Sequence, residues 1–271
     1  MIQHIQSFLK PTLLVGLALA TIPVFAESDR DEKRGRDECR DLPTHAQVLA
    51  ALKNAVTNGN NGGFALNMWA TIVNRDGIVC SVAFSGNDRG DQWPGSRVIS
   101  AQKANTANAF SLPGLALSTA NLYSATQPGG TLFGLQESNP VNTQAAYAGP
   151  SERYGQANDP LVGKKIGGVN VFGGGLGLYN KDGKLVGALG VSGDTSCTDH
   201  VIAWKIRHLL NLDNVPAGVS GTHDDNIVHD ISANATGHLV SASGWGHPVC
   251  EPVALAIAQQ LPVTHPIGPT P

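Results

Sequence analysis

Histidine is the residue type in this sequence best suited to bind a metal ion. His200 and His208 are eight positions apart in a segment of helical periodicity, with Trp204 between them on the same face. Two helical turns separate such residues by about 12 Å, so they cannot share one metal ion. We interpret them as a polar stripe on a half-buried helix.

Two other histidine segments have different surroundings. His223-Asp224-Asp225 and His229-Asp230 offer imidazole and carboxylate ligands, but such clusters are also common on solvated loops, and we predict no metal site. His247 lies in the segment Gly244-Trp245-Gly246-His247-Pro248. A rigid turn there could direct the imidazole at a ligand, or the imidazole could form a structural hydrogen bond.

The sequence contains no recognisable nucleophile or phosphate-binding motif. Gly190-Val191-Ser192-Gly193 lacks the spacing of a Gly-x-Ser-x-Gly elbow. Phe172-Gly173-Gly174-Gly175 is neither a dinucleotide fingerprint nor a phosphate loop with its lysine. Its glycines would instead let a ligand or another element approach the backbone closely. From the residues alone we identify no catalytic centre.

Composition limits the class of protein that can carry these residues. The chain has 271 residues, of which 14% are charged and 41% hydrophobic, with a formal net charge of -3. Disorder requires higher charge or lower hydrophobicity, and a nucleic-acid-binding protein requires a positive surplus. Because 32 glycines and 16 prolines favour turns, a long helical bundle is also excluded.

The N-terminus predicts export. Residues 1–26 combine a basic start, an apolar run and the cleavage site Val24-Phe25-Ala26, as secretory signal peptides do. The apolar run is too short to span about 30 Å of hydrocarbon comfortably. We therefore predict a periplasmic or secreted protein with no membrane segment after cleavage.

Export gives the four cysteines a structural role. Cys39, Cys80, Cys197 and Cys250 would lie in a compartment that permits disulfides. Four cysteines allow three pairings, and sequence cannot choose among them. We favour Cys39–Cys80 and Cys197–Cys250, because each joins a flank of the fold to its centre.

The elements that must position these residues can be read from periodicity and turn signals. Asn-x-Asp-Gly turns join two predicted hairpins, and a helix is expected before the first hairpin and after each of them. A long irregular insertion and a short final hairpin complete the predicted domain, residues 42–260. It lies between a charged disordered leader, residues 27–41, and an extended Pro-rich tail, residues 261–271. The predicted helices start at Thr44, at Ser96 and near Asp194 to Ser196; the hairpins cover residues 64–84 and 169–191, the insertion 112–165 and the final hairpin 226–241.

Two motifs resemble those of the GlcG/HbpS-like haem-binding family, also called the haem-degrading domain family. The first is Arg89-Gly90-Asp91, followed by Ser96 and Lys103-Ala104-Asn105-Thr106-Ala107. The second is Gly174-Gly175, Gly183, Val186-Gly187-Ala188-Leu189-Gly190-Val191-Ser192-Gly193, Asp199 and Ala203. The longer insertion and C-terminal extension, with Ser100 and Gly177 in place of the usual alanine and proline, suggest an exported long-form member.

The resemblance implies a single α/β (α+β) domain of profilin-like fold, with an antiparallel sheet flanked by helices. It also implies haem or a related cofactor, and frequent homo-oligomerisation. It assigns ligand-facing roles to Lys103, Gly174, Gly175 and Asp199, with Arg89 less directly. Lys103 could meet a carboxylate, although Lys103 and Asp199 could equally pair with each other.

We therefore expect an exported small-molecule binding protein, haem being the leading ligand, rather than an enzyme. His247 is our first choice as axial ligand and His200 our second. One alternative is an enzyme or accessory protein of hydroxy acid or diol catabolism that uses Lys103 and Asp199 as acid and base. The other is a structural subunit of an oligomer, with glycine-rich surfaces at the interface.

Overall fold

The computed structural model describes residues 38–268. The predicted signal peptide, residues 27–37 of the charged leader and residues 269–271 of the tail lie outside the described residues. The elements are α2 (His45–Thr57), β1 (Trp69–Asn74), β2 (Val79–Phe84), α3 (Ser96–Phe110), η1 (Thr119–Leu122), α4 (Tyr123–Thr126), α5 (Thr143–Ala146), η2 (Ser151–Arg153), β3 (Gly175–Tyr179), β4 (Leu185–Ser192), α6 (Ser196–Leu209), β5 (Ile231–Ala233), β6 (Leu239–Ser241) and α7 (Pro252–Thr264).

The centre of the fold is a four-stranded antiparallel sheet in the order β2-β1-β4-β3. It is built from the two predicted hairpins, joined where β1 pairs with β4 from Trp69↔Ser192 to Asn74↔Gly187. Each Asn-x-Asp-Gly turn works in the same way: the asparagine side chain accepts backbone N–H groups, and the glycine takes a positive φ. The prediction of a mixed α/β fold with a helix-flanked antiparallel sheet is confirmed.

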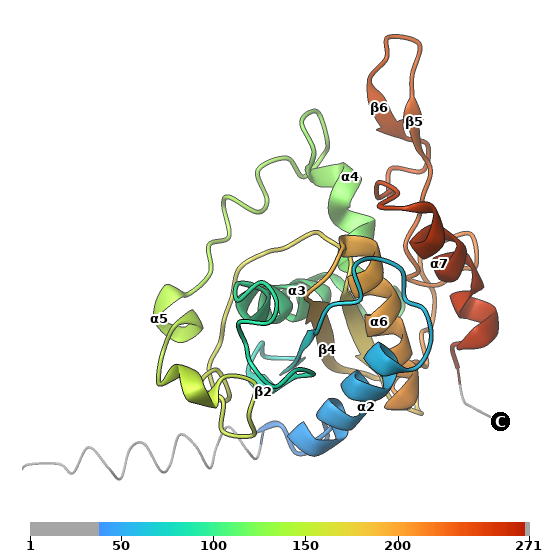
Figure 1. Cartoon of the computed structure of the whole chain (residues 1–271). Helices are drawn as coiled ribbons and strands as arrows, with labels where there is room; N and C mark the ends of the chain where they lie inside the picture. Colours follow the sequence, from blue (N-terminus) through green and yellow to red (C-terminus); the bar gives the residue numbers. More distant parts are fainter. Residues whose placement is uncertain (1–37, 269–271) are drawn as a thin grey trace, which may run out of the picture.

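Helices cover both faces of the sheet (Figure 1). One core lies between the sheet and α2, α6 and α7, and a second core lies between the opposite face and α3. The second layer packs closely, because small residues face each other on α3 and β4. A Cβ on Gly190 of β4 would overlap the backbone of Ser100 and Ala104. α3 and α6 therefore approach β4 from opposite sides, close to where β4 ends.

Both long predicted strands begin later than the sequence suggested. Phe64 and Leu66 do not join β1, because their backbone N–H groups donate to the Asp194 carboxylate at 2.9 and 3.1 Å. Residues 169–174 precede β3 rather than extending it, because the backbone N–H of Gly173 donates to Ser196 Oγ at 2.7 Å. At both places a side-chain oxygen thus accepts the backbone N–H groups that a neighbouring strand would otherwise bind.

The predicted extended tail from Leu261 is wrong for its first residues, because α7, which the sequence analysis did not predict, runs to Thr264. Leu261 is fully buried against the helical layer. Pro262 removes one helical N–H donor, and the carbonyl of Ala258 that it leaves accepts from Asn226 Nδ2 at 2.8 Å instead. Apolar burial and this substitute bond allow the helix to continue past a proline.

Two disulfides, Cys39–Cys80 and Cys197–Cys250, join the flanks to the core, in the pairing that the sequence analysis favoured. The first ties the described end of the charged leader to β2, so the prediction of disorder is wrong for residues 38–41, which are held on the fold. The second ties the C-terminal extension to α6. Within residues 38–268, no helix is both long and apolar enough to cross a bilayer.

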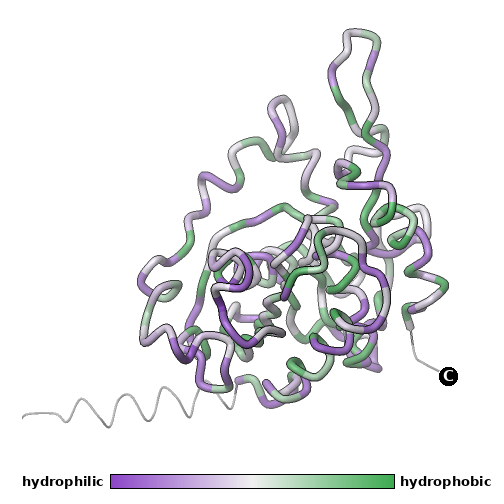
Figure 2. The backbone as a smooth tube through the Cα atoms, in the orientation of Figure 1, coloured by the Kyte–Doolittle hydropathy of each residue, from purple (hydrophilic) through white to green (hydrophobic). Residues whose placement is uncertain are grey.

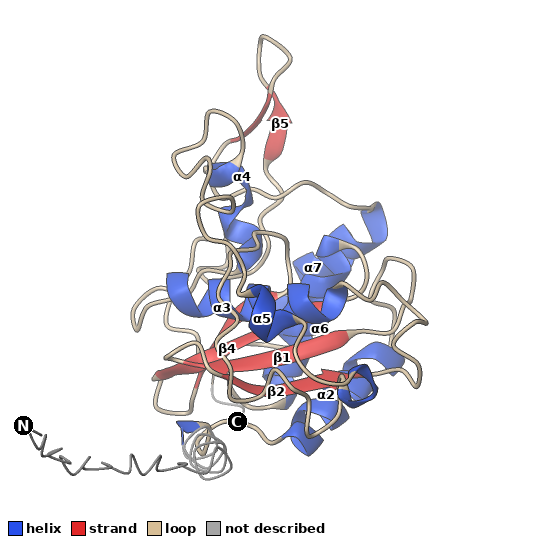
Figure 3. Cartoon of the chain, turned by 90° about the vertical axis from the view of Figure 1, so that its left-hand side faces the viewer, coloured by secondary structure: helices blue, strands red, loops and turns tan. Residues whose placement is uncertain are grey.

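Two segments project beyond this core (Figures 1 and 3). One is the loop that follows α4, and the other is the β5–β6 hairpin that the sequence analysis expected. Leu239 and Val240 on the hairpin are 74% and 44% exposed, and Figure 2 shows apolar stretches along it. The hairpin thus offers apolar surface outside the two cores.

Candidate functional site

A buried ion pair forms where α3, the end of β4 and α6 meet. Lys103 Nζ lies 2.6 Å from Asp199 Oδ2 and donates to the carbonyl of Val191 at 3.1 Å. Asp199 Oδ1 accepts the backbone N–H of Asp194 at 3.0 Å. Burial raises the pKa of Asp199 to about 6 and lowers that of Lys103, although each charge favours the charged form of the other.

A cavity of about 230 Å³ opens beside this pair. Trp93 and Phe172 are 54% and 45% exposed, so they form an aromatic rim, while Lys103 and Asp199 are buried within. Trp93 also makes an edge-to-face contact with Phe64. The lining residues are Trp93, Gly95, Ser96, Ile99, Lys103, Phe172, Ser192, Asp194, Ser196 and Asp199.

The three glycines before and at the start of β3 bring the chain against both helices of the site. A Cβ on Gly174 would overlap the Val191 carbonyl oxygen and lie 3.3 Å from Lys103 Nζ. Cβ atoms on Gly173 and Gly175 would overlap backbone oxygens of α6 and α3. The close approach expected from the sequence is therefore an approach to other elements of the fold.

The remaining predicted site residues lie apart from the ion pair. Arg89 is exposed on the loop after β2. His200 is fully buried on α6, where its Nε2 lies 3.2 Å from Asn226 Oδ1 and 3.1 Å from the backbone nitrogen of Ile227. Burial lowers the pKa of His200 to about 3, so this imidazole is neutral at ordinary pH.

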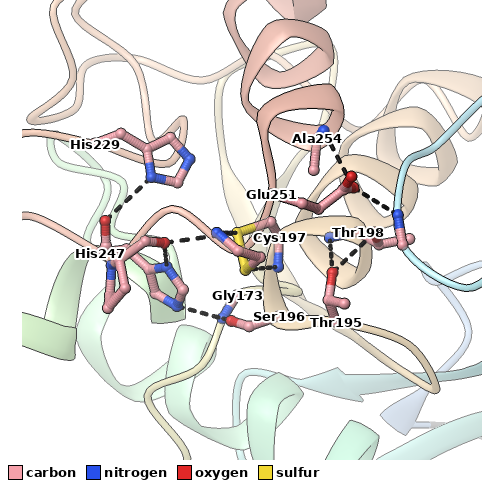
Figure 4. The surroundings of a disulfide bond; sticks show 12 residues. Gly173, Thr195, Ser196, Cys197, Thr198, His229, His247, Glu251 and Ala254 are labelled. Carbon is pink, nitrogen blue, oxygen red and sulfur yellow. Dashed lines mark hydrogen bonds between the residues drawn. A yellow bond between two sulfur atoms is a disulfide. The ribbon is translucent and has the colours of Figure 1, made fainter.

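His247 is hydrogen-bonded to Ser196, a residue that lines the cavity and that the sequence analysis missed. His247 Nε2 lies 2.7 Å from Ser196 Oγ, and His247 Nδ1 lies 2.7 Å from the carbonyl oxygen of Pro248 (Figure 4). Burial lowers the pKa of His247 to about 4. No linear motif could have revealed this pair, because 51 positions separate the two residues.

The acidic residues near His223 are used structurally. Asp225 pairs with Arg207 at 2.7 Å, and Asp224 accepts hydrogen bonds from Ser220 and Thr222. Among residues 38–268, the group of His, Cys, Asp or Glu ligands close enough to hold a metal is Cys197, His247 and Cys250, whose two cysteines form a disulfide.

The fold and this site define a mixed α/β protein with a small cavity over a buried lysine–aspartate pair. Residues 44–207 match the model of the family described as Haem degrading protein HbpS-like, and the chain belongs to this family. The match covers Lys103, Gly174, Gly175 and Asp199 and ends within α6, so the β5–β6 hairpin and His247 lie in the chain's own extension.

Solved structures that are similar to this chain include two named proteins. The structure of a PduOC–heme complex is 23% identical, with a TM-score of 0.43, and the match covers 63% of this chain and 96% of that one. The Klebsiella pneumoniae protein ORFY is 24% identical, with a TM-score of 0.41 and coverage of 62% and 90%. No curated protein matches the chain.

Proposed function

We propose that the protein binds a haem-type ligand, a planar ring that bears carboxylates, at the Lys103–Asp199 cavity and its aromatic rim. The observation that carries the proposal is a buried cationic side chain, Lys103, in a cavity whose rim exposes Trp93 and Phe172. A lysine suits a propionate carboxylate, and aromatic side chains suit the face of a porphyrin. Membership of the HbpS-like family supports this class of ligand.

The size of the cavity determines how such a ligand would lie. About 230 Å³ is less than the roughly 300–1,000 Å³ of pockets that enclose a small ligand, so a whole porphyrin does not fit inside. A second hollow of about 530 Å³ shares Trp93 with it and includes Phe64 and Gly90 in its lining. We assign one carboxylate to Lys103 and the ring to the surface around Trp93, with Arg89, which precedes Gly90, near a second carboxylate.

The two histidines first considered as axial ligands have no role in this binding mode. His200 is fully buried, and both ring nitrogens of His247 already have protein partners. The affinity would therefore come from the ring and the carboxylates rather than from an iron–imidazole bond. It follows that a porphyrin without iron should bind about as tightly as hemin.

Titration with hemin and with protoporphyrin IX tests whether a haem-type ligand binds and whether its affinity is independent of iron. Each should quench tryptophan fluorescence to saturation, with dissociation constants within a few-fold of each other. Trp93→Ala and the double variant Lys103→Met/Asp199→Asn should each weaken binding at least about tenfold, as expected when a charged or stacked contact of about 1.4 kcal/mol is lost. Tyr147→Ala, a change in an exposed aromatic residue that does not line the cavity, is the matched control.

Two outcomes would count against the proposal in different ways. A hemin signal that rises without saturation would refute haem binding. Saturable binding of hemin without binding of protoporphyrin IX would refute this site, because the iron would then supply the affinity.

We also propose export and self-association. The two disulfides support export, since such bonds persist in oxidising compartments. Mature protein recovered outside the cytoplasm should begin at Glu27, and an unprocessed N-terminus there would contradict cleavage. The apolar residues exposed on the β5–β6 hairpin support a homo-oligomer, and a monomer mass in light scattering would contradict it.

A further inference from the structure

Ser196 and His247 form a hydrogen-bonded pair whose chemistry the binding function does not use. Ser196 is half-buried, opens α6 and lines the same cavity as Lys103. Its Oγ lies 2.7 Å from His247 Nε2. A serine within hydrogen-bonding reach of a base that is itself oriented by a third group is the arrangement that activates a serine for nucleophilic attack.

The hydrogen bonds around the pair fix the direction of the serine proton. The carbonyl of Pro248 can only accept, so the hydrogen on His247 must be on Nδ1, which lies 2.7 Å from that oxygen. Nε2 is then an acceptor, and the Ser196 hydroxyl is the donor. The backbone N–H of Gly173 donates to Ser196 Oγ at 2.7 Å, which holds the oxygen in place (Figure 4).

The surroundings keep the imidazole neutral and rigid. His247 is 3% exposed, and burial lowers its pKa to about 4, with His229 and Lys103 as the charges that act on it in the same direction. The rings of Tyr123 and His229 lie 5.1 and 6.2 Å from its ring centre. At neutral pH the unprotonated imidazole therefore predominates, but it is a weaker base than a free imidazole. The hydrogen bond to the Pro248 carbonyl acts in the opposite direction and stabilises the imidazolium that forms when Ser196 gives up its proton.

A disulfide joins the two segments that carry the pair. Cys197 follows Ser196 directly, and Cys250 lies three residues after His247. Each cysteine backbone N–H also donates to the sulfur of the other cysteine at 3.2 Å. Because His247 and Cys250 lie beyond the region that matches the family, the extension supplies the base and the covalent bond that positions it.

We propose that Ser196 is a nucleophile activated by His247, and that the protein hydrolyses carboxylic esters whose acyl group is small enough for the cavity of about 230 Å³. Ser196 Oγ forms a bond to the acyl carbon while its proton moves to His247 Nε2. The ester C–O bond breaks, and the leaving alcohol takes that proton. Water then forms a bond to the acyl carbon and gives one proton to Nε2. The bond between the acyl carbon and Ser196 Oγ breaks and releases the acid, and the proton returns from Nε2 to Ser196 Oγ.

The cavity also offers a cationic donor for the oxyanion of this reaction, because Lys103 Nζ lies in its wall. Donors of this kind stabilise the charge that develops on the carbonyl oxygen in the transition state. The proposal does not depend on haem binding, since it requires only the serine, its base and the space in front of them.

Phenylmethylsulfonyl fluoride tests the nucleophile without knowledge of the natural substrate. Attack forms an O–S bond to Ser196, breaks the S–F bond and releases the proton with fluoride. We expect one adduct per chain, mapped to Ser196 by peptide mass spectrometry, and turnover of p-nitrophenyl acetate that the adduct abolishes. Ser196→Ala should lose both signals, and His247→Gln should slow labelling about 100-fold or more, the usual contribution of a general base.

Ser138→Ala is the matched control, because Ser138 is an exposed serine that does not line the cavity, so labelling and turnover should stay unchanged. Ser196→Ala keeps Trp93 and Lys103, so it should still bind hemin to saturation, which separates this test from that of haem binding. Absence of an adduct, an adduct on another residue, or equal labelling rates in wild type and His247→Gln would each overturn the proposal.

Discussion

Lys103 and Asp199 lie 96 positions apart in the sequence, yet their charged atoms are 2.6 Å apart in the interior. The pair bridges α3 and α6 across the end of β4, so it links the helical layers on the two faces of the sheet. An interior ion pair is costly to disrupt on one side only, because the remaining charge has lost its water and gained no partner.

Removing one charge should therefore cost more than removing both. We expect Lys103→Met to lower the free energy of unfolding by about 3–5 kcal/mol, because it leaves the Asp199 carboxylate buried without its partner. Lys103→Met/Asp199→Asn should recover at least half of this loss, since the amide oxygen of the substituted side chain can still accept the Asp194 N–H. Urea unfolding at pH 7 measures both variants. A double variant no more stable than Lys103→Met would show that the isolated charge is not the cause.

Gly174 should tolerate a methyl group far less well than Gly183. Both have positive φ, but a Cβ on Gly183 meets no atom within 4 Å, whereas one on Gly174 overlaps the Val191 carbonyl. We expect Gly183→Ala to cost about 1–2 kcal/mol, the usual strain of this backbone region. Gly174→Ala should cost several kcal/mol and weaken hemin binding. Thermal unfolding of the two variants makes the comparison, and equal losses would contradict the close approach.

Acid should weaken the fold partly through His200. An unfolded histidine titrates near 6.5, whereas burial and Arg207 lower the pKa of His200 to about 3, with His229 and His247 also acting against its charge. Between these values the unfolded chain binds the extra proton, so the free energy of unfolding falls as pH falls, by about 1.4 kcal/mol per unit for this group. The contribution of His200 to the free energy of unfolding is fully present above pH 6.5.

His200→Gln removes this titration and is the variant to compare. Between pH 6.5 and 4 its stability should fall less steeply than that of the wild type, by the equivalent of about one proton. Urea unfolding across that range gives both slopes. Parallel slopes would mean that His200 does not stay neutral in the folded protein.

The Cys197–Cys250 bond should contribute substantially to stability. It closes a loop with a sequence separation of 53, for which chain entropy predicts about 4 kcal/mol. We expect Cys197→Ala/Cys250→Ala to lose stability of this order in urea unfolding. A loss below about 1 kcal/mol would mean that the extension is held to α6 mainly by its packing.

The sequence predicted those parts of the fold that depend on neighbours in the chain. The Asn-x-Asp-Gly turns determined both hairpins, and Thr44 determined the start of α2, because side-chain caps and positive-φ glycines act over a few residues. The late starts of β1 and β3 were not predictable, since acceptors on Asp194 and Ser196 come from distant positions.

The same distinction applies to the candidate site: residues in local motifs could be predicted, whereas contacts between distant residues could not. Lys103 and Asp199 could be singled out because they lie in family motifs, and the structure places both at one cavity. The pairing of Ser196 with His247 could not be predicted, because the two residues meet only when the disulfide brings the extension onto α6. His200 is fully buried with its Nε2 beside Asn226 and Ile227, which helical periodicity did not reveal.

The Cys197–Cys250 disulfide also limits the effect of proteolysis on the protein. The exposed turn at residues 234–238 lies between the two cysteines in the chain, so a single cut there leaves both fragments linked through sulfur. A nicked molecule would migrate as one species on a gel without reductant and would separate only after reduction. Damage to the most protruding part of the protein would thus leave the serine and its histidine on one covalently connected molecule.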